Sequence, residues 1–129
     1  MESIQTKTIL LVEDDQISGR MYQNTFLVHG IECTLVATGE EAFEKLKNFL
    51  PDLILLDVKL ENSIDGFTIL EMIKKDSKLQ KIPVWLLTNI WETGNREKGV
   101  SLGAEDFIGK TNILPLDLVK KVKKRLGLV

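Results

Sequence analysis

Short apolar runs alternate with helix-length segments along the whole chain, and this rhythm constrains the fold most. Three of the runs are rich in Ile, Leu and Val, which is typical of parallel strands covered on both faces. Two weaker runs suit the edges of a sheet, because one alternates in polarity and the other is short. The pattern predicts five β-strands: Thr8–Val12, Ile31–Ala37, Leu53–Asp57, Val84–Thr88 and Asp106–Gly109.

Five further segments have the length and the apolar spacing of helices: Gln16–His29, Glu40–Leu50, Gly66–Lys75, Thr93–Leu102 and Leu116–Leu126. In each of the first two, an apolar stripe is expected to face the core: Ile17, Met21 and Val28 in the first, and Ala42, Phe43, Leu46, Phe49 and Leu50 in the second. Helix 93–102 is the poorest candidate, because Gly94 and Gly99 each cost up to ~1 kcal/mol relative to alanine. We expect it to be the most mobile element.

Five β-α units predict a doubly wound α/β sandwich of the flavodoxin type with a parallel sheet. The pattern alone does not determine the strand order, but 2-1-3-4-5 is common for a five-stranded sheet of this size and is the order that we expect. The 129 residues suit one domain, with an ordered core over about 7–127 and no output domain. The alternative is a fragment of a longer multidomain protein.

Composition excludes several classes of protein. A net charge of −2 gives no overall attraction to nucleic acid or to an anionic membrane. No apolar run approaches the ~20 residues that span a bilayer, and residues 1–7 lack the apolar core of a signal peptide. The single cysteine, Cys33, excludes an internal disulfide and is expected to be a buried thiol. These features favour a cytoplasmic protein.

Polar side chains follow the predicted strands where each strand ends: Glu13, Asp14 and Asp15, then Asp57, Thr88 and Lys110. In a sheet of this order, ligands gather at the carboxyl ends of the strands, and strands one and three are neighbours. The clustered carboxylates offer only oxygen ligands, which favours a hard cation such as Mg²⁺. With an ammonium and a hydroxyl close by, the group suits a phosphoryl site with Asp57 as the attacking oxygen.

In order and in spacing, these residues match a known family over essentially the whole chain. The matching segments are Val12-Glu13-Asp14, Leu55-Leu56-Asp57, Asp65-Gly66, Ile82-Pro83-Val84 through Leu87-Thr88, Gly103-Ala104 and Phe107 through Lys110. The chain resembles the receiver domains of response regulators in two-component signalling. The fragment alternative then becomes a receiver cut from a longer regulator or hybrid kinase.

The resemblance implies a role for each site residue. Asp57 would accept a phosphoryl group from a phosphohistidine on a histidine kinase or histidine phosphotransfer protein. Mg²⁺ would be bound by Asp14, Asp57 and the backbone carbonyl of Lys59, with Glu13 acting through water. Lys110 would pair with the phosphoryl oxygens.

The resemblance also implies a switch. Thr88 would turn toward the phosphoryl group and Phe107 would follow it, although Phe107 could instead be plain core. The surface formed by helix 93–102, strand 106–109 and helix 116–126 would then change, and a downstream protein target would bind differently. Such a protein is not a conventional enzyme, although Mg²⁺-dependent self-phosphorylation from small donors and slow autodephosphorylation are expected.

Three residues and one loop depart from the family pattern. Thr111 replaces the usual proline after Lys110, so a cis peptide bond is not assured there. Asn89 is larger than the usual residue after Thr88, and the loop 59–65 looks one residue longer. Lys59 places an ammonium near the phosphoryl group, where it could exclude the hydrolytic water. This suggests the hypothesis of a long-lived phosphoaspartate.

Other residues have plainer interpretations. Asp15 is expected to cap the following helix, and His29 to lie at a helix C-terminus rather than donate phosphoryl groups. Trp91 is equally compatible with contacting a partner and with covering the core. The basic run 120–125 favours a solvated face, with the docking of an acidic partner as the alternative.

Two other functions were considered beside the receiver interpretation, a phosphatase and a cofactor-binding protein, and the sequence argues against both. A phosphatase of the haloacid dehalogenase kind needs a second aspartate two residues after Asp57, where this chain has Lys59. A flavodoxin-like cofactor binder needs a phosphate-binding loop after strand one, where this chain has acids.

Overall fold

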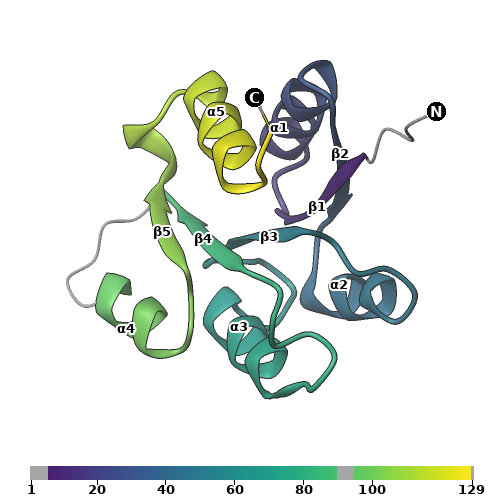
Figure 1. Ribbon diagram of the computed structural model, residues 1–129. Coiled ribbons are helices and arrows are strands. Elements are labelled where there is room, and N and C mark those ends of the chain that lie inside the picture. Colours follow the sequence, from purple (N-terminus) through teal and green to yellow (C-terminus); the bar gives the residue numbers. More distant parts are fainter. Residues whose placement is uncertain (1–5, 90–94, 129) are drawn as a thin grey trace.

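A computed structural model describes residues 6–89 and 95–128, which include a five-stranded parallel sheet in the order β2-β1-β3-β4-β5 (Figure 1). The fold class and the strand order are therefore as predicted. The strands are β1 (Lys7–Val12), β2 (Ile31–Val36), β3 (Leu53–Asp57), β4 (Val84–Thr88) and β5 (Asp106–Gly109). The predicted bounds of the last three are confirmed, and those of the first two differ by one residue.

Helices cover both faces of the sheet (Figure 1). On one face lie α1 (Gln16–Val28) and α5 (Pro115–Arg125), and on the other lie α2 (Gly39–Leu46), α3 (Gly66–Lys75) and α4 (Asn95–Ser101). A short 3₁₀ helix, η1 (Lys110–Asn112), follows β5. Each face has its own apolar core, because the central strands are buried on both sides.

Strand register brings the polar strand ends to one edge of the sheet. Val12 pairs with Leu56 across β1 and β3, Asp57 pairs with Leu87 across β3 and β4, and Thr88 is aligned with Gly109 of β5. The residues that follow β1, β3, β4 and β5 therefore emerge at the same level. This edge carries the candidate site.

The apolar stripe predicted for α1 is wrong. Ile17, Met21 and Val28 are 84%, 38% and 80% exposed, while α1 buries Tyr22 and Phe26. The prediction followed the aliphatic residues and overlooked the two aromatic ones, which bury more area per residue. Gly19 lies on the same buried face, where an added Cβ would come within 2.8 Å of a side-chain carbon of Leu35.

The predicted extent of α2 is also wrong at its end. The helix stops at Leu46, and Leu50 is 61% exposed instead of joining the core. Proline disfavours helical backbone in the residue before it, and Leu50 precedes Pro51. Ala42 and Leu46 are buried as predicted, Thr38 caps the helix, and Phe43 and Phe49 pack partly buried against the core.

The remaining helices agree more closely with the prediction. The bounds of α3 are confirmed, and α5 begins one residue earlier, with Pro115 in its first turn. In α4, the described helix has seven residues, and Gly94 lies outside the described residues, as does Trp91. Buried Gly99 lets α4 approach β4 and β5, since a Cβ there would lie 2.7 Å from a carbon of Leu86. The mobility of α4 stays a prediction.

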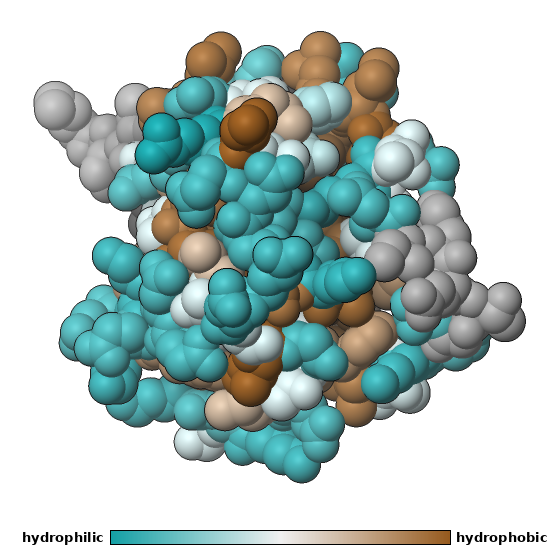
Figure 2. All heavy atoms as spheres, turned by 180° about the vertical axis from the view of Figure 1, so that it is seen from behind, coloured by the Kyte–Doolittle hydropathy of each residue, from teal (hydrophilic) through white to brown (hydrophobic). Residues whose placement is uncertain are grey.

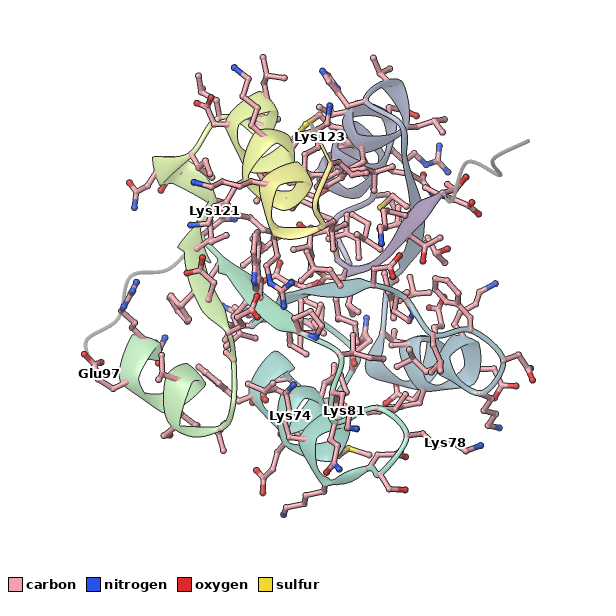
Figure 3. The ribbon with its side chains drawn as sticks, viewed as in Figure 1. Lys74, Lys78, Lys81, Glu97, Lys121 and Lys123 are labelled. Atoms are coloured by element: carbon pink, nitrogen blue, oxygen red, sulfur yellow. The ribbon has the colours of Figure 1, made fainter. Side chains whose placement is uncertain are left out.

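Part of the basic run 120–125 is engaged within the chain. Arg125 pairs with both carboxylate oxygens of Glu105 at 2.8 Å, and Glu105 also accepts a hydrogen bond from Trp85 Nε1. Lys121 of α5 pairs with Asp106 at the start of β5 (Figure 3). These contacts fasten α5 to the sheet. Among the described residues, no helix is long and apolar enough to cross a membrane.

Candidate phosphoacceptor site

Three charged residues from three strand ends meet at the carboxyl edge of the sheet. Lys110 follows β5, and its Nζ donates to Asp57 Oδ2 at 2.7 Å and also to Glu13 Oε1. All three side chains are almost entirely buried. A buried carboxylate is tolerated only when it is paired, so Lys110 explains why charges stand at the ends of apolar strands.

Asp57 is held by the backbone around it. The Lys59 N–H donates to Asp57 Oδ1 at 3.2 Å, and the Gly66 N–H donates to the Val58 carbonyl at 2.7 Å. A Cβ at Gly66 would lie 2.2 Å from the Asp57 carbonyl oxygen. Only glycine therefore lets α3 begin so close to the end of β3, which explains the Asp65-Gly66 pair of the sequence.

Asp14 and Asp15 have different surroundings. Asp15 caps α1, because Oδ1 accepts from the backbone N–H groups of Ile17 and Ser18, as predicted. Asp14 Oδ2 instead accepts from the Glu61 N–H at 2.8 Å. This bond ties the end of β1 to the loop after β3. Sequence reasoning missed Glu61, and the only available signal was the unusual length of that loop.

The crowding of charges changes the affinity of the site for protons. Burial, helped by a hydrogen bond with Asp57, raises the pKa of Glu13 to about 7, although Lys110 opposes this. Burial alone would lower the pKa of Lys110, but the adjacent Asp57 and Glu13 outweigh it and raise that pKa. Lys110 is therefore favoured in its charged form, and Glu13 takes up a proton near neutral pH.

A cation fits the donor set of this site. Glu13, Asp14 and Asp57 each offer a carboxylate oxygen, and these oxygens lie within 4.8 Å of one another. A set of oxygen ligands suits a hard divalent ion. The roles predicted for the Lys59 carbonyl and for a water on Glu13 stay predictions.

A cavity of about 240 Å³ opens over these carboxylates. Thr88, at the end of β4, is buried and lines it, as do the exposed residues Lys59 and Asn89. Phe107 does not belong to the lining; it is buried in the core beneath α4. Among the residues that the structure describes, the lining consists of Glu13, Asp14, Asp15, Asp57, Lys59, Glu61, Thr88, Asn89 and Lys110.

Lys110 points toward Asp57 although this chain has Thr111 where the family usually has proline. The described residues contain no cis peptide bond, so the bond between Lys110 and Thr111 is trans. Lys110 nevertheless reaches Asp57 directly.

Known proteins resemble this chain in sequence and in structure. The response regulator receiver domain family matches residues 9–123. The polar-differentiation response regulator DivK of Brucella ovis is 29% identical over 122 residues, which cover 95% of this chain and 98% of DivK. A putative response regulator from Chloroflexus aurantiacus has a TM-score of 0.85 and 30% identity, covering 95% of this chain and 99% of that one.

A third likeness is to the phosphorylated cyanobacterial phytochrome response regulator RcpA, with a TM-score of 0.83, 30% identity and 93% of each chain covered. Receiver domains are phosphoacceptor switches of two-component systems rather than conventional enzymes, and they interact with a kinase or a phosphotransfer protein. The match across 9–123, together with the sheet order, shows that the chain belongs to the response regulator receiver domain family.

Proposed function

We propose that Asp57 is the residue that takes the phosphoryl group, from a phosphohistidine on a histidine kinase or a histidine phosphotransfer protein. The observation that carries the proposal is the position of Asp57, which is buried at a strand end, lines the cavity and lies 2.7 Å from the Lys110 ammonium. Four other carboxylates line the cavity: Glu13, Asp14, Asp15 and Glu61. Asp14 and Asp15 accept hydrogen bonds from backbone N–H groups, and Glu13 accepts one from Lys110.

The proposed step is a direct displacement at phosphorus. A carboxylate oxygen of Asp57 forms a bond to phosphorus, and the P–N bond to the histidine ring breaks. The bonding pair stays on that ring nitrogen, and the ring leaves neutral if its other nitrogen already carries a proton. Lys110 balances the negative charge that collects on the phosphoryl oxygens, because a fixed ammonium in a buried site is effective there.

Mg²⁺ would be held by Asp14 and Asp57, with the Lys59 carbonyl as a further ligand and Glu13 acting through water. When bound, the ion supplies positive charge that lowers the repulsion between the carboxylates and an incoming phosphoryl group. Two observations support this: the three carboxylate oxygens lie within 4.8 Å of one another, and burial together with the neighbouring Asp57 raises the pKa of Glu13.

The switch would pass from Thr88 to Phe107 and α4. Thr88 borders the cavity, and Phe107 lies against Gly99 of α4, where a Cβ would come within 3.3 Å of its ring. A turn of the Thr88 hydroxyl toward the phosphoryl group would free space that Phe107 could occupy. The face of α4, β5 and α5 would then bind a downstream protein, in the cytoplasm and without direct contact to nucleic acid.

The test is intact-mass spectrometry after incubation with acetyl phosphate. We expect one added phosphoryl group that requires Mg²⁺, and its loss in Asp57→Asn. Asp15→Asn is the matched control, because it keeps a good helix cap and lines the same cavity. An adduct that survives Asp57→Asn would disprove the assignment of the acceptor.

A further inference from the structure

The loop between β3 and α3 is anchored by apolar residues on both sides of a polar tip. Hydrophilic residues cover much of the middle of the face shown in Figure 2, with apolar residues between them, and the loop 59–65 repeats this pattern on a small scale. Glu61 and Asn62 at its tip are exposed, whereas Leu60 is buried and Ile64 packs half-buried against the core. The burial of these two neighbours restricts the paths that the tip can take.

The backbone of the tip is bent in a way that few residues adopt. Asn62 has a φ of 55°, and it is the only residue other than glycine with a positive φ in the part of the chain that the structure describes. Asparagine tolerates this left-handed conformation better than most residues do. A turn whose first inner residue, Glu61, has a negative φ and whose second has a positive φ matches type II. The tip therefore has one defined conformation.

Ser63 fastens the loop to the start of α2. Its Oγ accepts a hydrogen bond from the Gly39 N–H at 2.8 Å and donates one to the Ile64 carbonyl at 2.9 Å. Gly39 is the first residue of α2, so its N–H has no partner within that helix, and the Ser63 hydroxyl satisfies it. The two segments lie close together, because a Cβ at Gly39 would come within 2.8 Å of a carbon of Ile64. The loop is therefore tied to a third element as well as to β3 and α3.

This anchored loop presents one N–H group to the acidic edge of the sheet. The Glu61 N–H donates to Asp14 Oδ2 at 2.8 Å, across 47 positions of the sequence. Lys110 orients the carboxylates of Glu13 and Asp57. Asp14 is oriented by the backbone of the loop instead. The bond engages one oxygen of the Asp14 carboxylate, so the other can bind a cation.

We infer that Ser63 and the backbone of the turn at Glu61 position Asp14, and that they determine how tightly the site binds Mg²⁺. The inference rests on the proposed function, in which Asp14 is a ligand of the ion. A hydrogen bond to a ligating carboxylate fixes its orientation, and removing such a bond typically weakens metal binding about 10- to 100-fold. Glu61 thus contributes through its main chain, which a pattern of side chains does not reveal.

Two substitutions of Glu61 separate its N–H group from its side chain. Glu61→Pro removes both, and proline suits the first inner position of a type II turn. Glu61→Ala removes the side chain alone, so the difference between the two variants reports the N–H group. Isothermal titration calorimetry with MgCl₂ measures the dissociation constant. We expect Glu61→Pro to bind the ion about 10-fold more weakly than Glu61→Ala. Equal dissociation constants would overturn the inference.

A second pair of variants tests the attachment of the loop to α2. Ser63→Ala leaves the Gly39 N–H without its acceptor, so the loop is held less firmly and Mg²⁺ should bind about 3-fold more weakly. Ser63→Thr keeps the hydroxyl oxygen and should restore the wild-type dissociation constant. A role in folding alone would lower the free energy of unfolding in EDTA without changing Mg²⁺ binding. That result would refute the positioning role of Ser63.

Hydrogen exchange of the Glu61 amide tests the contact without any ion. Glu61 is exposed, so slow exchange of its amide in EDTA reports the bond to Asp14. Asp14→Ala should speed this exchange about 10-fold, and Ser63→Ala should speed it to a smaller extent. The Lys59 amide donates to Asp57 and is the internal reference, whose rate should stay the same. Unchanged exchange at Glu61 in both variants would contradict the inference.

The outcomes separate a failure of this inference from a failure of the proposed function. A wild type that binds no Mg²⁺ would refute the proposed metal site, and the inference with it. A wild type that binds the ion while Glu61→Pro matches Glu61→Ala would refute the inference alone. Circular dichroism checks the fold of each variant. If Glu61→Pro does not fold, the comparison of Ser63→Ala with Ser63→Thr decides.

Discussion

Lys59 stands two residues after the proposed phosphoacceptor, and its position suggests that it protects the phosphorylated form. Its backbone N–H donates to Asp57 Oδ1, and its exposed side chain lines the same cavity. An ammonium there would bind the phosphoryl oxygens and occupy the space from which a water must attack. Lys59→Asn should therefore speed the loss of the phosphoryl group about 10-fold, which equals ~1.4 kcal/mol of activation free energy.

The rate is measured by intact mass after removal of acetyl phosphate. Lys81→Asn is the control, because Lys81 is an exposed lysine in the connection between α3 and β4, outside the cavity lining (Figure 3). Equal rates in the wild type and Lys59→Asn would refute the protective role.

Glu13 should make stability depend on pH. Its pKa is about 7 in the folded chain, against an ordinary value of 4.5 that applies once the chain is unfolded, so the native state binds the proton more tightly. The stabilisation from this group is complete below pH 4.5 and is lost as the pH rises through 7. Urea unfolding in EDTA between about pH 4.5 and 8 measures it. Glu13→Gln should remove this part of the dependence, and an unchanged pH profile would contradict the assignment.

For single residues, the sequence predicted which side chains stand at the strand ends, because the ends of parallel strands lie along the same edge of the sheet. Asp57 and Lys110 came together for this reason. The bond from the Glu61 backbone to Asp14 and the sharing of Lys110 with Glu13 were not predicted. They depend on loop conformation and side-chain rotamers, which no periodic pattern encodes.

Among the elements, the start of α3 is the most constrained by the site. An alanine at Gly66 would bring its Cβ to 2.2 Å from the Asp57 carbonyl oxygen and 2.7 Å from Val58 Cα, both of which are backbone atoms. Backbone cannot yield as a side chain can, so α3 or the end of β3 must shift. We expect Gly66→Ala to lower the free energy of unfolding by about 2–3 kcal/mol.

The same shift displaces Asp57, so phosphorylation from acetyl phosphate should slow as well. Urea denaturation and intact mass measure the two effects. Thr68→Ala serves as the control, because Thr68 is exposed and lies in the same first turn. Wild-type values for both properties in Gly66→Ala would show that α3 does not need this close approach.

Helix faces were harder to predict than strands. In a buried strand almost every residue is apolar, so β3 and β4 could be predicted without knowing which side chains face which side of the sheet. In α1, apolar residues occupy two faces, and only the tertiary structure decides that Tyr22 and Phe26 point inward while Ile17 and Val28 point to solvent.

For the whole molecule, the β-α alternation predicted a parallel sheet with helices on both faces, but it does not by itself determine the strand order. The order 2-1-3-4-5 was expected because it is common in five-stranded sheets of this size, and the structure has that order. That order places the ends of β1 and β3 side by side and so concentrates negative charge at one edge. A cation bound among these carboxylates would reduce the repulsion between them. Stability of the whole chain should depend on Mg²⁺.

We expect Mg²⁺ to raise the free energy of unfolding, because the three carboxylates converge only in the folded state. At a hundred times its dissociation constant, the ion should add about 2.7 kcal/mol. Urea unfolding in EDTA and in increasing MgCl₂ measures the gain, with KCl at equal ionic strength to account for screening. Asp14→Asn should lose most of the gain, while Asp65→Asn, which alters only the cap of α3, should keep it. The same gain in KCl, or in Asp14→Asn, would mean that the acidic edge binds no specific ion.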